Sequence, residues 1–516
     1  MKNLIYIFII LFVTVTIFVA CEKNIFSQPN EETEADMFNQ ELPIKNFAIA
    51  LAKVLAESRE CRELIKVESL KKMTHDNDVL YILVKNNILT DGSSLEDRLL
   101  KFLKQEELTS MLNDKPTLTI FVPTLPENSF SPELWNVETD LPQVAIRTTN
   151  PNTLVYNADG RMTVIKRNEI PAFPIVVLKD NERIKEVPVE TAKLRSIDSN
   201  FCFDFIDPIF NNLENNKNKM ESRLRGQTYE HIQKSLESYK IFNNSVEGWQ
   251  RDYVYYNLTK EINKGPFDSS NRESIVGFEM LGDGKSNYLK ISDSNGDPIL
   301  DGKYHKISID GNRYYLTPWT DGEFEFQVKC YFGNKNAGIT EYTNRFRCNP
   351  NQLFKMNLKR NSNNSTYTIL GYENLFIQPK LPLFDWNIEN YSATIKIRIE
   401  EFDLSETIKR ATSSTTEFAT NFSFEPSFSS VAKIGLKFGA STKNTQTVSY
   451  EETISVGSDD LGEVIINFGD NIVMDSTYIR KDIQLSTGSG GSISFPRLNP
   501  NYQTGYYRVY IAPMQQ

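Results

Sequence analysis

Apolar residues occupy alternate positions over much of the last third of this chain. Between Ile395 and Ile399 every second residue is isoleucine and the residues between them are charged. Further on, apolar residues fall mostly on even positions from Phe418 to Val456, with a break at Pro426. A period of two places every second side chain on one face of a strand. The pattern predicts a C-terminal β-domain over 385–516.

The stretch 411–456 has two interpretations. Its alternation, with Ser, Thr, Lys, Asn and Glu at most odd positions, is what a membrane-crossing β-hairpin requires, because one face meets lipid. In its alternating, Ser- and Thr-rich composition it is similar to the segment that aerolysin-type pore-forming proteins carry. The resemblance implies a membrane-active protein. Half-buried strands of a soluble sandwich have the same period. A strand pair whose even face belongs to the core is the interpretation we prefer.

The rest of the chain is predicted to be α+β and mainly β. Apolar residues at helical spacing between Phe47 and Leu103 predict three or four short helices. Short β-like runs follow at Leu118–Val122, Val144–Arg147, Met162–Lys166 and Ile175–Leu178, and residues 157–160 read as a hairpin turn. The fold class is therefore an N-terminal helical segment, then a small mixed domain and two antiparallel β-sandwich-like domains.

The predicted domain boundaries follow these changes in period. Asp-Gly and Asn-Gly pairs recur at 283–284, 295–296, 301–302, 310–311 and 321–322, which indicates short strands joined by tight turns. We expect a helical domain at 42–112, a small β-rich domain at 113–200, a helical connector at 201–247, a β-sandwich-like domain at 248–384 and the C-terminal β-domain at 385–516.

The N-terminus carries the longest apolar run in the chain. Lys2 is followed by a run from Leu4 to Ala20 that is apolar except for Thr14 and Thr16, and Cys21 comes next. A basic start, an apolar stretch and a small residue at its end are typical of a signal peptide, here residues 1–20. The alternative is an uncleaved signal anchor, since about twenty apolar residues span a bilayer.

The residues around Cys21 resemble the lipobox of bacterial lipoproteins. Val19, Ala20 and Cys21 match it, and Phe18 stands where leucine is usual. The resemblance implies that Cys21 is acylated, palmitate being a typical chain, and that several chains hold the protein stably in the outer membrane. Residues 21–41 are polar and acidic, which predicts a flexible tether similar to that of surface lipoproteins of Bacteroidota. The body would face the periplasm or the cell surface.

Charge argues against nucleic acid as a partner. The chain has 57 Lys and Arg against 67 Asp and Glu, a formal net charge of −10, and no Lys/Arg-rich run. A protein that binds a phosphate backbone needs a basic footprint. We therefore expect a lipid membrane, and a protein or glycan ligand, as partners.

The cysteine positions are equally consistent with a disulfide and with free thiols. None of the five forms a CxxC pair, so a zinc site made from them is not expected. Cys330 and Cys348 lie in consecutive strand-like segments, Phe324–Phe332 and Thr343–Cys348. They are candidates for a disulfide outside the cytoplasm. The equal alternative is two buried, unlinked thiols, because spacing alone does not fix the geometry.

One segment resembles half of a calcium loop. Asp293, Asn295 and Asp297 offer oxygens at alternate positions. Pro298 and Tyr304 stand where such a loop would have glycine and glutamate, so an ordinary turn is the preferred interpretation and calcium the weaker one. We expect no other metal and no cofactor.

No catalytic residues are predicted. The three histidines, His75, His231 and His305, fall in different predicted regions, and no recognised nucleophile or phosphate-binding motif accompanies them. The leading hypothesis is a non-catalytic binding or adhesion protein of the cell envelope. The alternatives are a pore-forming or membrane-active protein that uses 411–456, and a hydrolase with an unrecognised carboxylate site.

Overall fold

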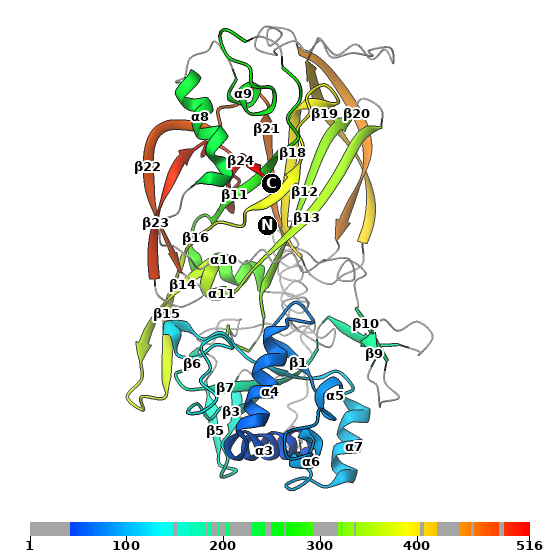
Figure 1. Cartoon of the computed structure of the whole chain (residues 1–516), viewed down its shortest axis with the longest axis vertical. Coiled ribbons are helices and arrows are strands. Elements are labelled where there is room, and N and C mark those ends of the chain that lie inside the picture. The colour runs from blue at the N-terminus through cyan, green and yellow to red at the C-terminus, as the bar shows by residue number, and fades with distance from the viewer. Residues whose placement is uncertain are drawn as a thin grey trace, which may run out of the picture.

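The chain folds into two lobes stacked along its longest axis (Figure 1). The fold is α+β with strands predominating, and helices at the N-terminus precede several antiparallel sheets, as predicted. The computed structural model describes residues 42–147, 152–166, 168–181, 183–187, 194–195, 202–205, 229–242, 249–262, 265–292, 318–320, 322–334, 337–402, 407–419, 443–455, 459–484 and 490–516. We call residues 42–205 the N-terminal lobe and residues 229–516 the C-terminal lobe.

The N-terminal lobe is a mixed sheet covered by short helices. Its six strands lie in the order β1-β2-β7-β3-β4-β5, and β3 and β7 are parallel while the other pairs are antiparallel. The elements are α3 (Leu42–Glu57), α4 (Arg59–Leu70), β1 (Asp78–Leu80), α5 (Tyr81–Val84), α6 (Leu95–Leu99), α7 (Gln105–Asp114), β2 (Leu118–Phe121), the 3₁₀ turn Pro126–Asn128, β3 (Gln143–Ile146), β4 (Thr153–Tyr156), β5 (Met162–Ile165) and β7 (Ile175–Asp180).

The helices form where their apolar stripes can cover this sheet. Helix α3 packs against β3 and buries Phe47, Leu51 and Leu55 completely. Ser58 caps α4 and Ser94 forms a capping box at α6, which satisfies backbone N–H groups at both helix starts. Strand β1 comes from within the segment expected to be purely helical and pairs with β2. Helices and strands on either side of residue 112 therefore share one core.

The C-terminal lobe is built around two packed antiparallel sheets. One contains β11, β16, β17 and β24, and the other has the order β13-β12-β18-β21. Phe278 of β11 packs against Phe326 of β12 and Phe346 of β13, with both pairs of ring centroids 5.3 Å apart. The strands are β11 (Asn271–Met280), β12 (Phe324–Asn334), β13 (Gly338–Cys348), β16 (Phe376–Ile377), β17 (Leu381–Phe384), β18 (Tyr391–Glu401), β21 (Asp459–Asn467) and β24 (Tyr507–Gln515).

Among the described residues, two long hairpins and four α-helices surround these sheets. Strands β22 and β23 pair with each other and close a second apolar cluster with Ile232, Val254 and Tyr510. Strands β19 and β20 form the other hairpin. The bounds are the 3₁₀ turn Glu230–Ile232, α8 (Gln233–Phe242), α9 (Gln250–Tyr256), α10 (Gly284–Ile291), α11 (Pro350–Leu353), β19 (Thr407–Ala419), β20 (Lys443–Ser455), β22 (Val473–Gln484) and β23 (Gly490–Leu498).

A small sheet joins the two lobes. Strand β15 (Thr366–Asn374) pairs with β14 (Phe354–Arg360) in the C-terminal lobe and with β6 (Glu169–Pro171) in the N-terminal lobe. The remaining small sheet of the N-terminal lobe has the order β8-β10-β9, with β8 (Ile184–Glu186), β9 (Leu194–Arg195) and β10 (Cys202–Phe205). The lobes are therefore connected by strand pairing as well as by the chain.

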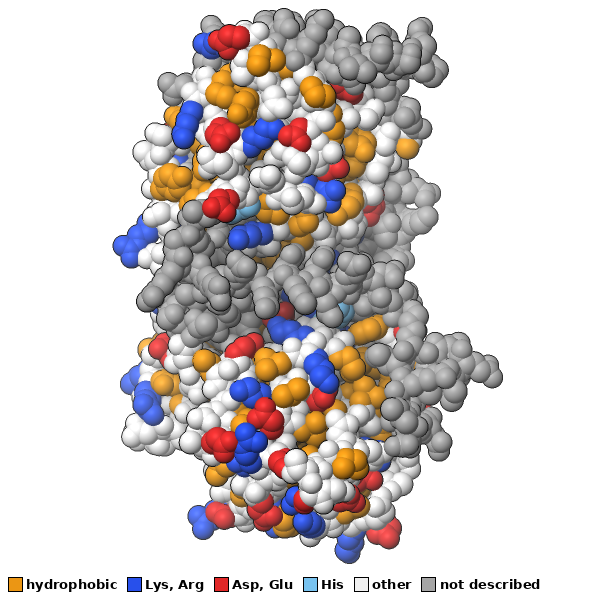
Figure 2. All heavy atoms as spheres, in the orientation of Figure 1, with side chains coloured by type: hydrophobic (Ala, Val, Ile, Leu, Met, Phe, Trp, Pro, Cys, Tyr) orange, Lys and Arg blue, Asp and Glu red, His pale blue; other side chains and the backbone are white. Residues whose placement is uncertain are grey.

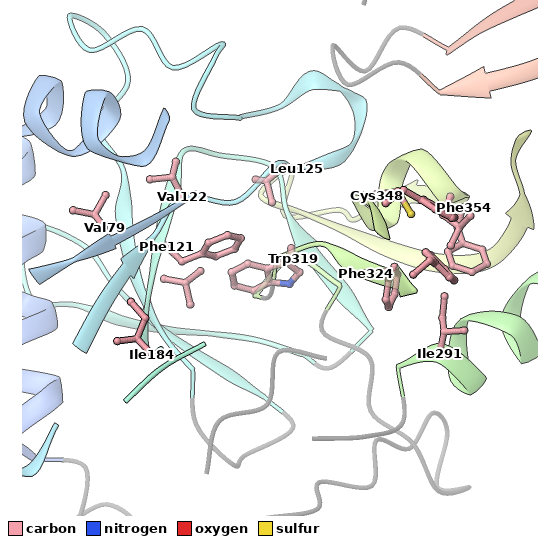
Figure 3. Packing of buried hydrophobic residues seen from close by; sticks show 14 of the residues in the cluster. Val79, Phe121, Val122, Leu125, Ile184, Ile291, Trp319, Phe324, Cys348 and Phe354 are labelled. Carbon is pink, nitrogen blue, oxygen red and sulfur yellow. The ribbon is translucent and has the colours of Figure 1, made fainter. Parts of the chain in front are cut away.

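Apolar packing continues across the junction of the lobes. The Trp319 side chain lies between Phe121 of the N-terminal lobe and Phe324 of the C-terminal lobe (Figure 3), and it is 2% exposed. Its indole N–H donates to the carbonyl oxygen of Glu169 over 3.1 Å. A buried tryptophan whose N–H is satisfied gives a large contact area at no polar cost, so the junction is a packed interface.

Buried charges also meet at this junction. Asp76 forms an ion pair with Arg183 over 2.9 Å and accepts a hydrogen bond from the backbone N–H of Glu323 over 3.2 Å. Burial by itself raises the pKa of the Asp76 carboxyl, but Arg183, Lys179 and Arg347 outweigh it and hold that pKa below its usual range. A Cβ on Gly322 would lie 2.2 Å from the Asp76 carboxylate, so only glycine fits there. This ionised carboxylate therefore links the two lobes.

A second buried pair anchors the centre of the C-terminal lobe. Arg251 of α9 donates to Glu273 of β11 through two nitrogens, over 2.7 and 3.3 Å, and to the carbonyl oxygen of Asp470 over 2.9 Å. The hydroxyl of Tyr255 also donates to Glu273, and the guanidinium lies over the Trp386 ring. The Arg251 side chain is 0% exposed and that of Glu273 1%. The pair therefore depends entirely on its internal partners.

Arg251→Ala is expected to lower the free energy of unfolding by about 3–5 kcal/mol, because it leaves the buried Glu273 carboxylate without its cation. Urea unfolding followed by circular dichroism measures this. The control is Arg251→Met with Glu273→Leu, which removes both charges at similar volume and is expected to lose much less stability. An Arg251→Ala variant no less stable than this control would contradict the role assigned to the pair.

Candidate functional site

Most residues that the sequence analysis names as sites lie outside the described residues. Cys21, with the signal peptide and the tether, is among them, and so are the calcium candidates Asp293, Asn295 and Asp297. These remain predictions. Among the described residues, no group of three or more His, Cys, Asp and Glu side chains is placed to hold a metal ion.

The candidate disulfide between Cys330 and Cys348 is wrong. The two strands do pair with each other, but Cys330 lies opposite Tyr342 and Cys348 lies opposite Phe324. Six residue positions separate the two cysteines along the strands, about 20 Å at the usual rise, whereas a disulfide needs Cα atoms within about 7 Å. Both thiols are buried and unlinked.

The two described histidines lie in different lobes. His75 sits at the lobe junction, where Arg347 donates to its carbonyl oxygen over 2.7 Å and contacts its Nδ1 over 3.0 Å. Burial lowers the pKa of His231 to about 4, and Lys380 adds to this effect, so His231 is neutral at pH 7. His305 lies outside the described residues. The geometry therefore does not bring His75 and His231 together.

The sheet β13-β12-β18-β21 offers the most unusual surface in the described structure. One of its faces is ordinary core: Phe326, Val328 and Cys330 of β12 and Ile397 and Ile399 of β18 all belong to the main apolar cluster. The residues between them point the other way because side chains alternate along a strand. That opposite face is charged, and much of it is nevertheless buried.

We call this opposite side the charged face and define it by its buried centre. Lys329 of β12 pairs with Glu400 of β18 over 2.6 Å, and their side chains are 2% and 3% exposed. Gln327 donates to the same Glu400 carboxylate over 2.5 Å. Arg345 of β13 pairs with Glu325 over 3.1 Å and donates to Gln327 over 2.9 Å. The buried groups therefore satisfy one another across three strands.

The charged face continues to the edge strand β21, where it becomes exposed. Arg398 pairs with Asp460 over 2.5 Å and Lys396 pairs with Glu463 over 3.0 Å. The acidic partners in these two pairs are 48% exposed, and Ile465 in the same strand is 58% exposed. Exposed pairs of this kind contribute little stability. The charged side chains of this face are therefore buried on β12 and β18, and their acidic counterparts on β21 are exposed to solvent.

The hairpin of β19 and β20, which we call the hairpin arm, lies against this sheet. Strand β19 packs against β18 and β12, and β20 packs against β13, so the arm runs beside the strands that carry the charged face (Figure 1). Within the described part of the chain, β19 and β20 hydrogen-bond to each other and to no other strand. The arm is thus docked on the body without joining a body sheet.

The arm and the sheet belong to one folded-back ribbon. Strands β18 and β21 are paired up to Glu401 and Asp459, and β19 and β20 resume pairing at Thr407 and Ser455. The connections 402–406 and 456–458 are five and three residues long, and all of their residues except Phe402 lie outside the described residues. Sequence reasoning missed this arrangement because alternation in β12 identifies its two faces, but not which strand pairs with it or what covers it.

Comparison with known proteins does not assign the chain to a family. No family model, no curated protein and no solved structure matches it. In the described ranges no helix combines the length and the apolar character needed to cross a membrane. On the face shown in Figure 2, Lys and Arg side chains are interspersed with Asp and Glu over both lobes. The function must therefore be argued from the site alone.

The thiols of Cys61, Cys330 and Cys348 are expected to resist alkylation in the folded protein and to react once it is unfolded. All three are buried, and burial raises the pKa of the Cys330 thiol, which keeps it protonated. Mass spectrometry after iodoacetamide treatment, with and without denaturant, measures this. Ile465→Cys provides an exposed thiol that should react in both states. A peptide that links residues 330 and 348 would contradict the structure.

Proposed function

We propose that this protein is held in the bacterial outer membrane by acylated Cys21 and that its hairpin arm acts on a lipid membrane. The observation that supports the proposal is that β19 and β20 form a two-stranded sheet of their own, with 13 residues in each strand. Membrane-crossing strands need about 9–11 residues. The arm is therefore long enough to cross, and in the described part of the chain its strands share no ladder with a strand of the body.

The sequence of the arm supports the same proposal. Ser, Thr, Ala, Lys and Glu occupy every odd-numbered position of β19 and β20, whereas the apolar residues all fall on even positions or at Ala411 and Ala419. The register pairs Ile408 with Ile454 and Thr412 with Tyr450. Paired positions share a face of a two-stranded sheet, so the larger apolar residues are assigned to one face, together with Arg410 opposite Glu452. Alternation of this kind is a feature of membrane-crossing hairpins.

A binding or adhesion protein remains the second candidate. It is favoured by β5, the edge strand of the six-stranded sheet, where Met162 is 42% exposed and Val164 47% exposed. Edge strands with apolar side chains pair readily with an added strand from a partner. A protein ligand that lies along β5 would fit this surface.

Dye release from liposomes separates the two candidates. The soluble body, residues 22–516, is expected to release a trapped dye if the arm acts on lipid. The matched control replaces residues 402–458 by Asn-Gly, because Glu401 and Asp459 lie opposite each other and a two-residue turn can join them. The control should lose at least about tenfold in release rate if the arm is responsible. Absence of release by the parent at high concentration would leave the binding protein as the better proposal.

Cys21→Ser is expected to abolish processing and retention of a lipid-modified form in the membrane, because the thiol is the proposed site of acylation. Fractionation of cells that express the full chain, followed by mass spectrometry of the N-terminal peptide, measures this. Ser27→Ala, in the expected tether, is the control and should be retained like the parent. A Cys21→Ser protein that stays membrane-bound at the parent's size would favour an uncleaved signal anchor.

A further inference from the structure

We infer that the C-terminal lobe has a binding site for a small organic ligand that carries a carboxylate or a phosphate. The site lies beside the hairpin of β22 and β23 and depends neither on the hairpin arm nor on β5. Its side chains, which we call the donor cluster, are those of Tyr229, His231, Gln378 and Lys380. Three observations on the described residues support the inference.

The first observation is that three buried polar atoms of the donor cluster have no hydrogen-bond partner among the described residues. They are the Tyr229 hydroxyl, Nε2 of His231 and the side-chain nitrogen of Gln378. Buried polar groups in folded proteins nearly always have a partner, so an unpaired group needs an explanation. The hydroxyl and the amide nitrogen can donate, and Nε2 donates in one tautomer and in the protonated ring. The cluster therefore suits a ligand that is rich in acceptors.

The second observation is the charge of the donor cluster. Among the described residues, Lys380 has no ion-pair partner, so its positive charge is not balanced by a neighbouring carboxylate. Burial lowers the pKa of His231 to about 4, and Lys380 lowers it as well, which places the ammonium group near the imidazole. A bound anion would balance the lysine and would pair with the donors around it. The acceptor-rich ligand is therefore expected to be negatively charged.

The third observation is that two segments of the chain bring the donor cluster to one place. Phe376 of β16 belongs to the apolar cluster closed by β22 and β23, whereas its neighbour Ile377 belongs to the main core. Because side chains alternate along an extended chain, Gln378 lies on the same side as Phe376. The centroid of the Phe495 ring is 4.7 Å from that of Phe376 and 6.3 Å from that of Tyr229. The end of β16 and the 3₁₀ turn Glu230–Ile232 therefore meet around Phe495.

Aromatic rings beside the donors indicate an organic ligand and not a bare ion. The centroid of the Tyr229 ring lies 6.2 Å from that of His231 and 5.6 Å from that of Tyr478. Burial raises the pKa of Tyr229 to about 12, and Tyr478 adds to this effect, so the Tyr229 hydroxyl keeps its proton and can donate. Tyr478 is 49% exposed. An exposed ring offers a face on which the apolar part of a ligand can stack.

Isothermal titration calorimetry of the full chain in detergent micelles tests the site. Glucuronate and glucose 6-phosphate carry the two anionic groups on the same kind of ring, and glucose is the uncharged control. At least one of the two anions is expected to bind below about 10 mM, where glucose should not bind. Binding of glucuronate alone identifies a carboxylate site, and binding of glucose 6-phosphate alone identifies a phosphate site. Absence of binding by both anions, or equal binding of glucose, overturns the inference.

A pair of lysine variants tests where the anion binds. Lys380→Gln removes the positive charge of the donor cluster and is expected to weaken binding at least about tenfold, because a charge-assisted hydrogen bond is lost. Lys359→Gln, at an exposed position of β14, makes the same change of net charge elsewhere and should bind like the parent. Unchanged binding by Lys380→Gln would place the ligand at another site and overturn the assignment.

Two further readouts separate binding from stability. Tyr229→Phe removes a buried hydroxyl that has no described partner, so the free protein should unfold at a temperature no lower than the parent's, while binding should weaken at least about fivefold. Nuclear magnetic resonance of the histidine rings follows His231, whose signal is assigned by its loss in His231→Gln. A bound anion should raise the pKa of His231 from about 4, because it favours the protonated ring. A His231 pKa unchanged at saturation would overturn its place in the site.

Discussion

Strand β12 is buried along almost its whole length, yet its residues alternate between apolar and polar. One side of the strand can therefore be covered by the aromatic core, and the other has to be covered by something that tolerates Glu325, Gln327 and Lys329. Ion pairs with β13 and β18 supply the local partners, and the hairpin arm packs against the same strands. Much of the C-terminal lobe follows from this requirement: a sandwich on one side, a docked two-stranded hairpin on the other.

The segments 324–332 and 343–348, which the sequence analysis treats as strand-like, lie within β12 and β13. A strand-like pattern does not predict the register of two strands, since the same faces result from any even shift. This is why two cysteines in paired strands looked like candidates for a disulfide, although Cys330 faces Tyr342. For the same reason the sequence does not predict the Lys329–Glu400 pair, whose members are about seventy residues apart in the sequence.

Other elements show where local signals suffice. The turn predicted at 157–160 joins β4 and β5, with Gly160 at a φ of +75°. The Asp283-Gly284 pair, read as a turn, instead begins α10, because the Asp283 side chain caps the helix by accepting from the N–H of Ser286. Asp-Gly serves either role, and only the residues that follow decide between them. Strand β1 has three residues and depends on β2 for its pairing, so it carries no signal of its own.

The pairing of β6 with β15 has a consequence for how the chain comes to be folded. Pro171 of β6 pairs with Thr366 of β15. Strand β6 therefore stays unpaired on this edge until a strand roughly two hundred residues later has been synthesised. At ribosomal speeds of about 5–20 residues per second, that delay is on the order of 10–40 seconds. During that time β6 is an unprotected strand edge. A cell that makes this chain would therefore have a reason to keep it bound to a chaperone until synthesis is nearly complete.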